Sequence, residues 1–215
     1  MWAPPPNGRA GTSPAPTTLC DSKIRMKKEF LKQAIEESLR LKESFFTGNL
    51  EAIVRFEEML KQVSAARKKV LVFGNGGSAA DAQHFAAELM HRVEQKPIGI
   101  RALALHTDTS LLTALGNDEG FERVYSRQIQ VLAEPGDLAV AISTSGTSTN
   151  IVDALRTARS VPCGTVGLLG RDGGSALSWC DLALVVPHSS TPRIQEVHGM
   201  IIHLVCQLLE TEPES

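Results

Sequence analysis

The stretch LVFGNGGSAADAQHFAAE, residues 71–88, constrains the fold more than any other part of the chain. The apolar run 70–73 is short and contains β-branched valines, which predicts a buried strand that leads into a Gly-rich turn and then a helix beginning near Ser78. The N–H groups at such a helix start suit a phosphate. On this helix His84 and Glu88 stand four residues apart and share one face, which suits a metal ion or an acid/base pair.

From Lys69 onward strands and helices alternate, in the order of a parallel sheet covered on both faces. The expected strands are 70–73, 100–105, 138–143, 164–170 and 182–186. The expected helices are about 79–93, 109–116, 121–133, 148–160, 174–179 and 192–210. This order predicts an α/β fold, a doubly wound three-layer sandwich with a five-stranded parallel sheet, and a site in the loops after the first and third strands.

The N-terminal part divides into a leader and two helices. Residues 1–22 are rich in Pro, Gly, Ser and Thr without periodicity, which predicts a disordered leader. Amphipathic helices are expected at 24–46 and 50–65, on either side of a break at Gly48 and Asn49. Such helices cover a sheet or pack against a second subunit. Residues 23–212 are expected to form one domain, which the length of 215 residues and 42% apolar content favour.

Charge indicates the class of partner, and cysteine content indicates the cellular compartment. The formal net charge of −2 and the isoelectric point near 6.3 give no electrostatic footprint for nucleic acid or an anionic membrane, so we expect a small molecule or another protein. The chain has no apolar signal segment and no 18-residue apolar run. The cysteines form no C-x-x-C pair, which predicts reduced, structural thiols in a cytoplasmic protein. They are Cys20, Cys163, Cys180 and Cys206.

The second expected ligand loop reads AISTSGTSTN, residues 141–150. Its hydroxyl residues, Gly146 and the following helix start can hold a phosphate without a basic residue. An ordinary capping loop is the alternative, but two such loops on one sheet favour a phosphorylated metabolite. No Lys follows either Gly run, and no third spaced Gly follows Gly77, which disfavours P-loop nucleotide hydrolysis and dinucleotide binding.

The last helix carries polar residues in TPRIQEVHGMIIH, residues 191–203. An amide oxygen from Gln195 and an imidazole from His203 are acceptable zinc ligands. They stand eight residues apart, about 12 Å along an ideal helix. They can share one ion only through long side chains, a bent helix start or neighbouring subunits. His198 is expected to be a core histidine bonded to the backbone or to a carboxylate.

The ordered series of motifs resembles the sugar isomerase (SIS) domain of the phosphoheptose isomerases. The motifs are GNGGS, D-A-x-H-F-A-x-E, GND at 116–118, ISTSG-x-S, and RIQE-x-H with a His five residues beyond. The resemblance covers about residues 28–210. It implies a zinc-containing homotetramer with active sites between subunits. It also implies interconversion of sedoheptulose 7-phosphate and D-glycero-D-manno-heptose 7-phosphate, the first step of ADP-heptose biosynthesis, which feeds lipopolysaccharide synthesis.

Site residues follow from the same resemblance. The implied ligands of one zinc ion per subunit are His84, Glu88, Gln195 and His203. The implied substrate-binding residues are Asn75, Gly76, Gly77, Ser78, His84, Glu88, Asn117, Asp118, Ser143, Thr144, Ser145, Ser148 and Gln195. In an isomerisation through a cis-enediol, Glu88 is the expected base and His203 the expected acid. A group that is both ligand and base requires partial metal occupancy or ligand exchange during turnover.

Three other interpretations stand beside this one. Relatives of the family bind the bacterial replication initiator as tetramers, but they lack the full set of polar residues at the positions of Glu88 and His203, so both residues favour the enzyme. The same fold serves as a regulatory sugar-phosphate module in transcription factors, yet no helix-turn-helix with a basic face is visible. A different aldose/ketose phosphate isomerase is the third.

Overall fold

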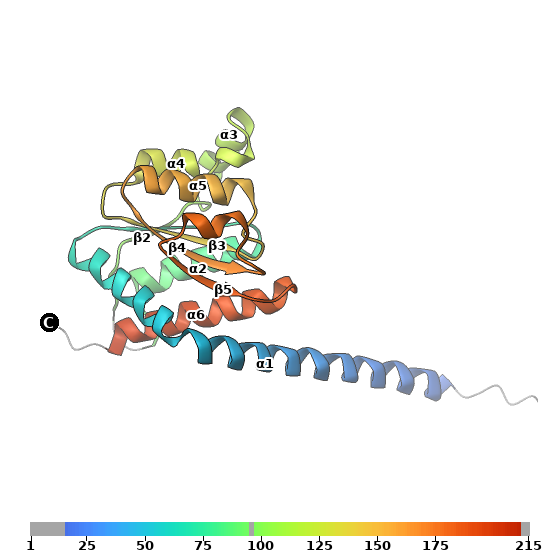
Figure 1. The fold of residues 1–215 in the computed structure, drawn as a ribbon. Coiled ribbons are helices and arrows are strands. Elements are labelled where there is room, and N and C mark those ends of the chain that lie inside the picture. Colours follow the sequence, from blue (N-terminus) through green and yellow to red (C-terminus); the bar gives the residue numbers. More distant parts are fainter. Residues whose placement is uncertain (1–15, 95–96, 212–215) are drawn as a thin grey trace, which may run out of the picture. The chain divides into compact units, whose positions relative to one another are not determined.

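The computed structural model describes residues 16–94 and 97–211 (Figure 1). It divides into two compact units, Met1–Leu41 and Lys42–Ser215. Residues 1–15 of the expected leader lie outside the described residues, while 16–22 belong to the first helix, α1 (Pro16–Ala65). The single domain expected for 23–212 stays a prediction.

The two expected N-terminal helices are segments of α1 that meet at a kink. Asn49 has a non-helical backbone, with φ −129° and ψ 15°, and its Nδ2 donates to the Phe45 carbonyl at 2.7 Å. The side chain thus donates to a carbonyl of the turn that precedes the kink. The break expected at Gly48 and Asn49 is therefore confirmed as a change of direction. No described helix combines the length and apolar character that crossing a bilayer requires.

Five parallel strands form one sheet, in the order β2-β1-β3-β4-β5. The strands are β1 (Val70–Gly74), β2 (Ala102–Ala104), β3 (Leu138–Ser143), β4 (Gly164–Gly170) and β5 (Leu182–Val186). The doubly wound α/β prediction is confirmed, and three strands match at both ends. β2 is shorter than expected; it is an edge strand, and its Leu103 is 41% exposed.

The helices differ from expectation mainly around Tyr125. The segment expected as one helix over 121–133 is a short 3₁₀ turn followed by a helix, and Tyr125 lies at the break, where its buried hydroxyl donates to the Gly74 carbonyl. The segment expected at 174–179 is 3₁₀. The elements are α2 (Gly77–Met90), α3 (Thr109–Asp118), η1 (Phe121–Arg123), α4 (Ser126–Leu132), α5 (Thr149–Ser160), η2 (Gly174–Trp179) and α6 (Thr191–Thr211).

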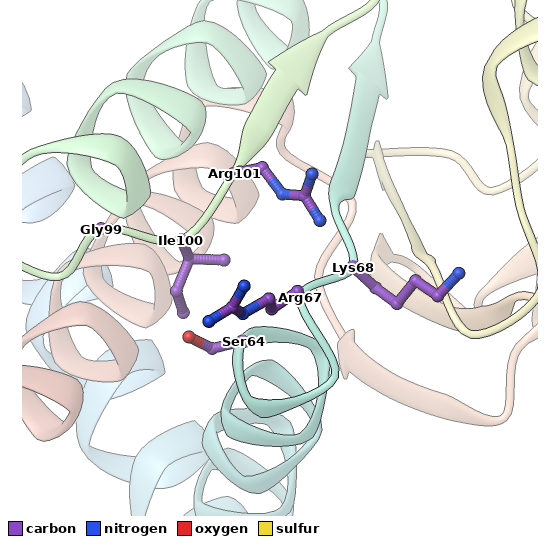
Figure 2. Close-up of a pocket in the computed structure, with 6 residues that line it drawn as sticks. All are labelled: Ser64, Arg67, Lys68, Gly99, Ile100 and Arg101. Carbon is purple, nitrogen blue, oxygen red and sulfur yellow. The ribbon is translucent and has the colours of Figure 1, made fainter. Parts of the chain in front are cut away.

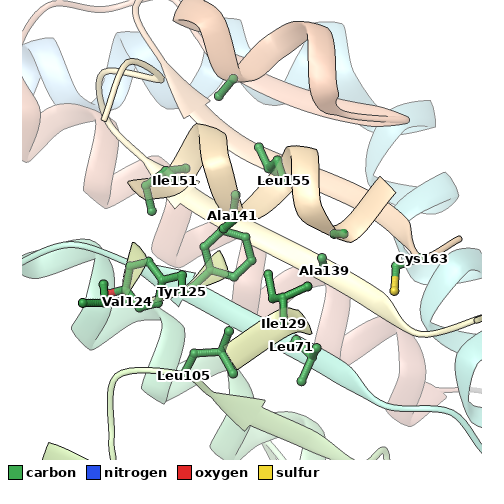
Figure 3. Packing of buried hydrophobic residues seen from close by; sticks show 14 of the residues in the cluster. Leu71, Leu105, Val124, Tyr125, Ile129, Ala139, Ala141, Ile151, Leu155 and Cys163 are labelled. Carbon is green, nitrogen blue, oxygen red and sulfur yellow. The ribbon is translucent and has the colours of Figure 1, made fainter. Parts of the chain in front are cut away.

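Helices cover both faces of the sheet. α2 packs on β1 and β3 and against α6, whereas α5 packs on the other face with α4. Figure 3 shows this second layer, where Ile151 and Leu155 of α5 lie over Ala141 of β3, and Ile129 of α4 lies near Leu71 of β1. Fully burying one such aliphatic side chain contributes roughly 1.5–3 kcal/mol. The sheet is therefore fixed from both sides, which gives its carboxyl edge a rigid base.

The chain reverses its winding direction between β1 and β3. From β1 the crossover through α2 leads to β2 on one side, and from β3 the crossover through α5 leads to β4 on the other. The two strands pair in register up to Gly74 and Ile142. Ligands of open α/β sheets bind at such a switch point. The two loops expected to hold a ligand therefore begin side by side.

Gly74 allows the close approach that this junction requires. A Cβ there would lie 2.5 Å from the Ser78 carbonyl oxygen and 2.9 Å from the Ile142 carbonyl oxygen. Both obstacles are backbone atoms of neighbouring elements, so neither moves without moving α2 or β3. Only glycine fits at the end of β1.

Replacement of Gly74 by Ala is expected to lower the free energy of unfolding by about 1–3 kcal/mol through overpacking. The control is Gly199→Ala in α6, where nothing lies within 4 Å of the added Cβ and a gain of roughly 0.5–1 kcal/mol is expected. Urea unfolding of both variants measures the difference. Equal stability of the two variants would contradict the close packing described.

Candidate active site

A buried carboxylate lies between two imidazoles where α2 meets α6. Glu88 Oε1 is 2.8 Å from His84 Nε2 and 2.8 Å from His203 Nδ1. The two imidazole rings meet edge to face, with centroids 4.8 Å apart. Sequence positions 84 and 88 share one helix face, and the fold supplies position 203 from the neighbouring helix. Three of the four expected metal ligands are thus brought together.

The cluster is open on the histidine side and closed on the carboxylate side. The side chains of His84 and His203 are 42% and 45% exposed, against 10% for Glu88. Glu88 Oε2 is buried, and no described N–H or O–H donates to it. The Cys206 thiol contacts this carboxylate, and its pKa lies above the ordinary value because of burial first and the charge of Glu88 second. The thiol is therefore a neutral neighbour of the cluster.

The donor set fits a divalent ion such as zinc. One ligand atom from each of His84, Glu88 and His203 lies within 4.8 Å of the others, and an ion with bonds of about 2.0–2.2 Å can sit among donors so arranged. A cation would also neutralise the buried Glu88 carboxylate, which is costly to keep charged in an apolar surrounding. Two imidazoles and one carboxylate are ligands typical of zinc.

Gln195, the fourth expected ligand, belongs to α6, and its side chain lies against the start of α2. A Cβ on Gly77 would collide with the Gln195 side-chain amide, so the amide rests against the first residue of that helix. Further along the same helix, Glu88 meets His203. From the first contact to the second, the residue numbers rise in both helices, from 77 to 88 in α2 and from 195 to 203 in α6. The two helices therefore run in the same direction. The ligand role of Gln195 stays a prediction.

The Gly-rich turn forms a cradle at the start of α2. Gly76 has φ +56°, a conformation that favours glycine, and Gly77 is the first helical residue. The Ser78 N–H donates to the Asn75 carbonyl at 3.0 Å, and Ser78 is buried. This geometry aims the helix start at the carboxyl edge, where an anion is favoured.

The hydroxyl loop, residues 143–148 at the end of β3, is held by hydrogen bonds to its own serine side chains. Ser143 Oγ accepts from the Gly146 N–H at 3.0 Å, and Ser145 Oγ accepts from the Thr147 N–H at 3.2 Å. Ser148 is the N-cap residue of α5, and its side chain makes no capping hydrogen bond. The loop therefore presents the Ser148 hydroxyl next to a helix start, as an anion site requires.

Close backbone packing supports the hydroxyl loop from the β4 side. A Cβ on Gly146, whose φ is +64°, would collide with the Gly173 carbonyl, and one on Gly170 would collide with the Thr144 carbonyl. The Gly146 carbonyl also accepts from the Ala176 N–H at 2.8 Å. The loop after β3 thus rests on the loop after β4.

Asn117 and Asp118 lie at the end of α3, on the side of the sheet that α5 covers. Asn117 Nδ2 donates to Asp118 Oδ1 at 2.7 Å, and the pair is exposed. The structure does not bring this pair to the carboxylate cluster, which lies between α2 and α6. Their substrate role stays a prediction.

Two residues near the site have no counterpart in the sequence interpretation. Asn150 forms a reciprocal amide pair with Asn75, and Tyr125 anchors the Gly74 carbonyl. Burial raises the pKa of Tyr125 to about 12, so its hydroxyl remains a donor at neutral pH. The sequence signal for Tyr125 was that it is the only tyrosine among the 215 residues. The only signal for Asn150 was its place as a polar residue in the first turn of a helix.

Comparison with known proteins identifies the family. Residues 33–170 match the family model described as SIS domain. A phosphoheptose isomerase of Trichlorobacter lovleyi is 46% identical over 181 residues, which are 84% of this chain and 92% of the relative. One of Geobacter sulfurreducens is 56% identical over 158 residues, 74% of this chain and 84% of the relative. The chain belongs to the phosphoheptose isomerase family of SIS-domain proteins.

Solved structures of the family agree with this assignment. Phosphoheptose isomerase from Neisseria gonorrhoeae superimposes with a TM-score of 0.81 at 41% identity, over 86% of this chain and 99% of that chain. The Francisella tularensis enzyme gives a TM-score of 0.82 at 30% identity, again over 86% and 99%. As a member of this family the chain is an enzyme, a sugar-phosphate isomerase. This favours the enzyme over the protein that binds the replication initiator and over the regulatory sugar-phosphate module.

A basic hollow lies at the amino end of the strands, away from the Gly-rich turn. It encloses about 340 Å³ and is lined by Ser64, Arg67, Lys68, Gly99, Ile100 and Arg101 (Figure 2). Arg67 and Lys68 follow the C-terminal end of α1, where cations complement the negative end of the helix dipole. Lys68 also pairs with Glu134 at 3.4 Å. Arg67 and Lys68 are therefore explained by helix termination.

The prediction for His198 is confirmed, and so is the thiol prediction for the three cysteines whose side chains the structure describes. The side chain of Cys20 lies outside the described residues. His198 is fully buried, and its Nε2 lies 3.1 Å from the Leu169 carbonyl oxygen. Cys163, Cys180 and Cys206 are free cysteines. Burial raises the pKa of Cys163 to about 11 and that of Cys180 to about 12. These thiols are structural side chains rather than nucleophiles.

We expect His198 to make the fold sensitive to acid. Burial lowers the pKa of His198 from 6.5 to about 4. The unfolded chain therefore binds more protons between these values, and stability falls as the pH drops from 6.5 toward 4, by on the order of 3 kcal/mol. Urea unfolding between pH 4 and 7 with chelator measures this loss. The His198→Gln variant should show a flatter profile, and an unchanged slope would contradict the assignment.

Proposed function

We propose that this enzyme interconverts sedoheptulose 7-phosphate and D-glycero-D-manno-heptose 7-phosphate, the first step of ADP-heptose biosynthesis. The relatives named phosphoheptose isomerase support this substrate. The observation that carries the chemistry is the bridging of two imidazoles by Glu88 Oε1, at 2.8 Å from each. A carboxylate and an adjacent imidazole supply the base and the acid that a C1 to C2 carbonyl shift requires.

Glu88 takes the proton from carbon, and His203 donates a proton to the substrate oxygen as the cis-enediol forms. The Nδ1 atom of His203 faces Glu88. The other ring nitrogen of His203, Nε2, is therefore available to the substrate. The partial exposure of His203 allows a ligand to reach it. The carboxylate is buried beneath the two rings, so a ligand reaches it from the exposed histidine side.

His84, Glu88, His203 and Gln195 are the proposed ligands of one zinc ion per subunit. When bound, zinc supplies Lewis acidity that stabilises negative charge on the substrate oxygens. Glu88 and His203 serve in both roles, so a ligand exchanges during turnover or the ion is bound for part of the time. Support for His84, Glu88 and His203 comes from their donor atoms, which the fold brings within 4.8 Å of one another. Gln195 is assigned by the resemblance alone.

The phosphate group is proposed to bind between the Gly-rich turn and the hydroxyl loop. The residues assigned to it are Asn75, Gly76, Gly77, Ser78, Ser143, Thr144, Ser145 and Ser148. Both segments follow neighbouring strands of the switch point. Holding the phosphate there keeps the reacting carbons at a fixed distance from the acid and the base.

The active enzyme is proposed to be a cytoplasmic homotetramer with sites between subunits. The helical unit that ends at Leu41 carries large exposed apolar side chains at helical spacing, among them Phe30, Leu31, Ile35 and Leu39. Such a surface indicates an interaction site. In this arrangement Asn117 and Asp118 contribute to a site across an interface.

Sedoheptulose 7-phosphate incubated with the enzyme should yield an aldose product that NMR detects. Glu88→Gln and His203→Ala should each lower kcat by about 10²-fold or more, because each removes one proton-transfer group. His91→Ala is the matched control, since His91 is an exposed histidine at the end of the same helix as Glu88.

The outcomes separate the interpretations. No product from folded wild-type oligomer would overturn the heptose assignment. Conversion of another sugar phosphate instead would identify a different aldose/ketose phosphate isomerase. Full activity in the Glu88→Gln variant would exclude Glu88 as the base.

Zinc titration of metal-free enzyme, followed by calorimetry, should show one ion per chain. His84→Ala should weaken binding by at least about tenfold because one imidazole ligand is lost, whereas His91→Ala should bind as wild type does. Chelation should abolish turnover, and added zinc should restore it. Turnover that survives complete chelation would reduce the ion to a structural role.

A further inference from the structure

An amide pair joins the two loops at the carboxyl edge of the sheet. Asn75 lies in the Gly-rich turn after β1, and Asn150 is in the first turn of α5. Asn75 Nδ2 donates to Asn150 Oδ1, and Asn150 Nδ2 donates to Asn75 Oδ1, both at 2.9 Å. Asn150 is only 3% exposed. The pair is thus part-buried, with Asn150 on its buried side. A hydrogen bond shielded from water is stronger, and its loss is more costly.

This pair lies just beyond the end of the backbone ladder. β1 and β3 are in register as far as Gly74 and Ile142. Beyond that point α2 and α5 leave toward opposite faces of the sheet. The two asparagine side chains continue the connection between the strands where the backbone no longer provides it. Two hydrogen bonds between planar amides fix both the separation and the orientation of the loops.

A phosphate held by both loops depends on that separation. Its donors must lie about 2.7–3.2 Å from the phosphate oxygens, and they come from two different strands. We infer, resting on the proposed function, that Asn150 is a positioning residue, which acts through Asn75 to set the distance between the two phosphate-binding loops. Asn150 itself needs no contact with the substrate. Asn75 keeps a second amide hydrogen that the pair does not use and that can reach the substrate.

A purely structural role leads to a different result. If the pair only stabilised the fold, its loss would lower the melting temperature and leave the phosphate affinity of the folded enzyme unchanged. A positioning role changes phosphate affinity in an enzyme that is still folded. The metal cluster lies further along α2 and α6, so zinc binding provides an internal reference.

The test uses zinc-loaded Asn150→Ala and Asn150→Leu, the second of which keeps the buried volume. Thr157→Val is the control on the same helix, because Thr157 is buried and its hydroxyl donates to the Asp153 carbonyl at 2.8 Å, away from both loops. Calorimetry measures the binding of inorganic phosphate and of sedoheptulose 7-phosphate. NMR-detected turnover gives kcat and KM.

Both Asn150 variants should bind phosphate more weakly and raise KM, each by about tenfold or more, with a smaller change in kcat. Zinc stoichiometry should stay at the wild-type value, and Thr157→Val should keep the wild-type KM. The double variant Asn75→Ala/Asn150→Ala should bind phosphate no more weakly than Asn75→Ala alone, because Asn150 acts only through Asn75.

Wild-type phosphate affinity and KM in the folded Asn150 variants would overturn the inference, as would additive losses in the double variant. Failure of the proposed function gives a distinct result. A wild-type enzyme that binds phosphate but does not convert the heptose overturns the substrate assignment, while the affinities of the variants still decide the role of Asn150.

Discussion

The pairing of β1 with β3 is the constraint on which the rest of the site depends. Two parallel strands in register end together, and the crossovers that follow them turn to opposite faces. Two helices therefore start next to each other, with their positive ends toward the same edge. Gly74 makes this possible, since α2 can begin only if the end of β1 carries no side chain. Neither loop carries a basic residue, so the helix starts are the positive groups at this edge.

The cluster of His84, Glu88 and His203 depends on a second constraint, the parallel packing of α2 and α6. Because the helices run in the same direction, the start of α6 faces the start of α2, and His203 reaches Glu88. One carboxylate oxygen then accepts from two imidazoles. The buried carboxylate and the exposed rings give the cluster a closed side and an open side, so a ligand has one direction of approach.

The sequence allowed much of the fold to be predicted, for local reasons. The strands 138–143, 164–170 and 182–186 match the structure because each is a buried apolar run. His84 and Glu88 share a helix face through spacing alone. The break near Tyr125 was missed because it depends on a hydrogen bond to Gly74, a residue 51 positions earlier. The Asn75 and Asn150 pair spans 75 positions, and no periodicity in the sequence indicates such a contact.

The contact between the loops after β3 and β4 restricts which substitutions this enzyme can accept. Gly146 faces Gly173 and Gly174 backbone to backbone, and a side chain on Gly146 or Gly174 would enter the other loop. These positions cannot change one at a time without displacing the hydroxyl loop. They form one packing unit, although almost thirty residues, helix α5 and strand β4 separate its two parts.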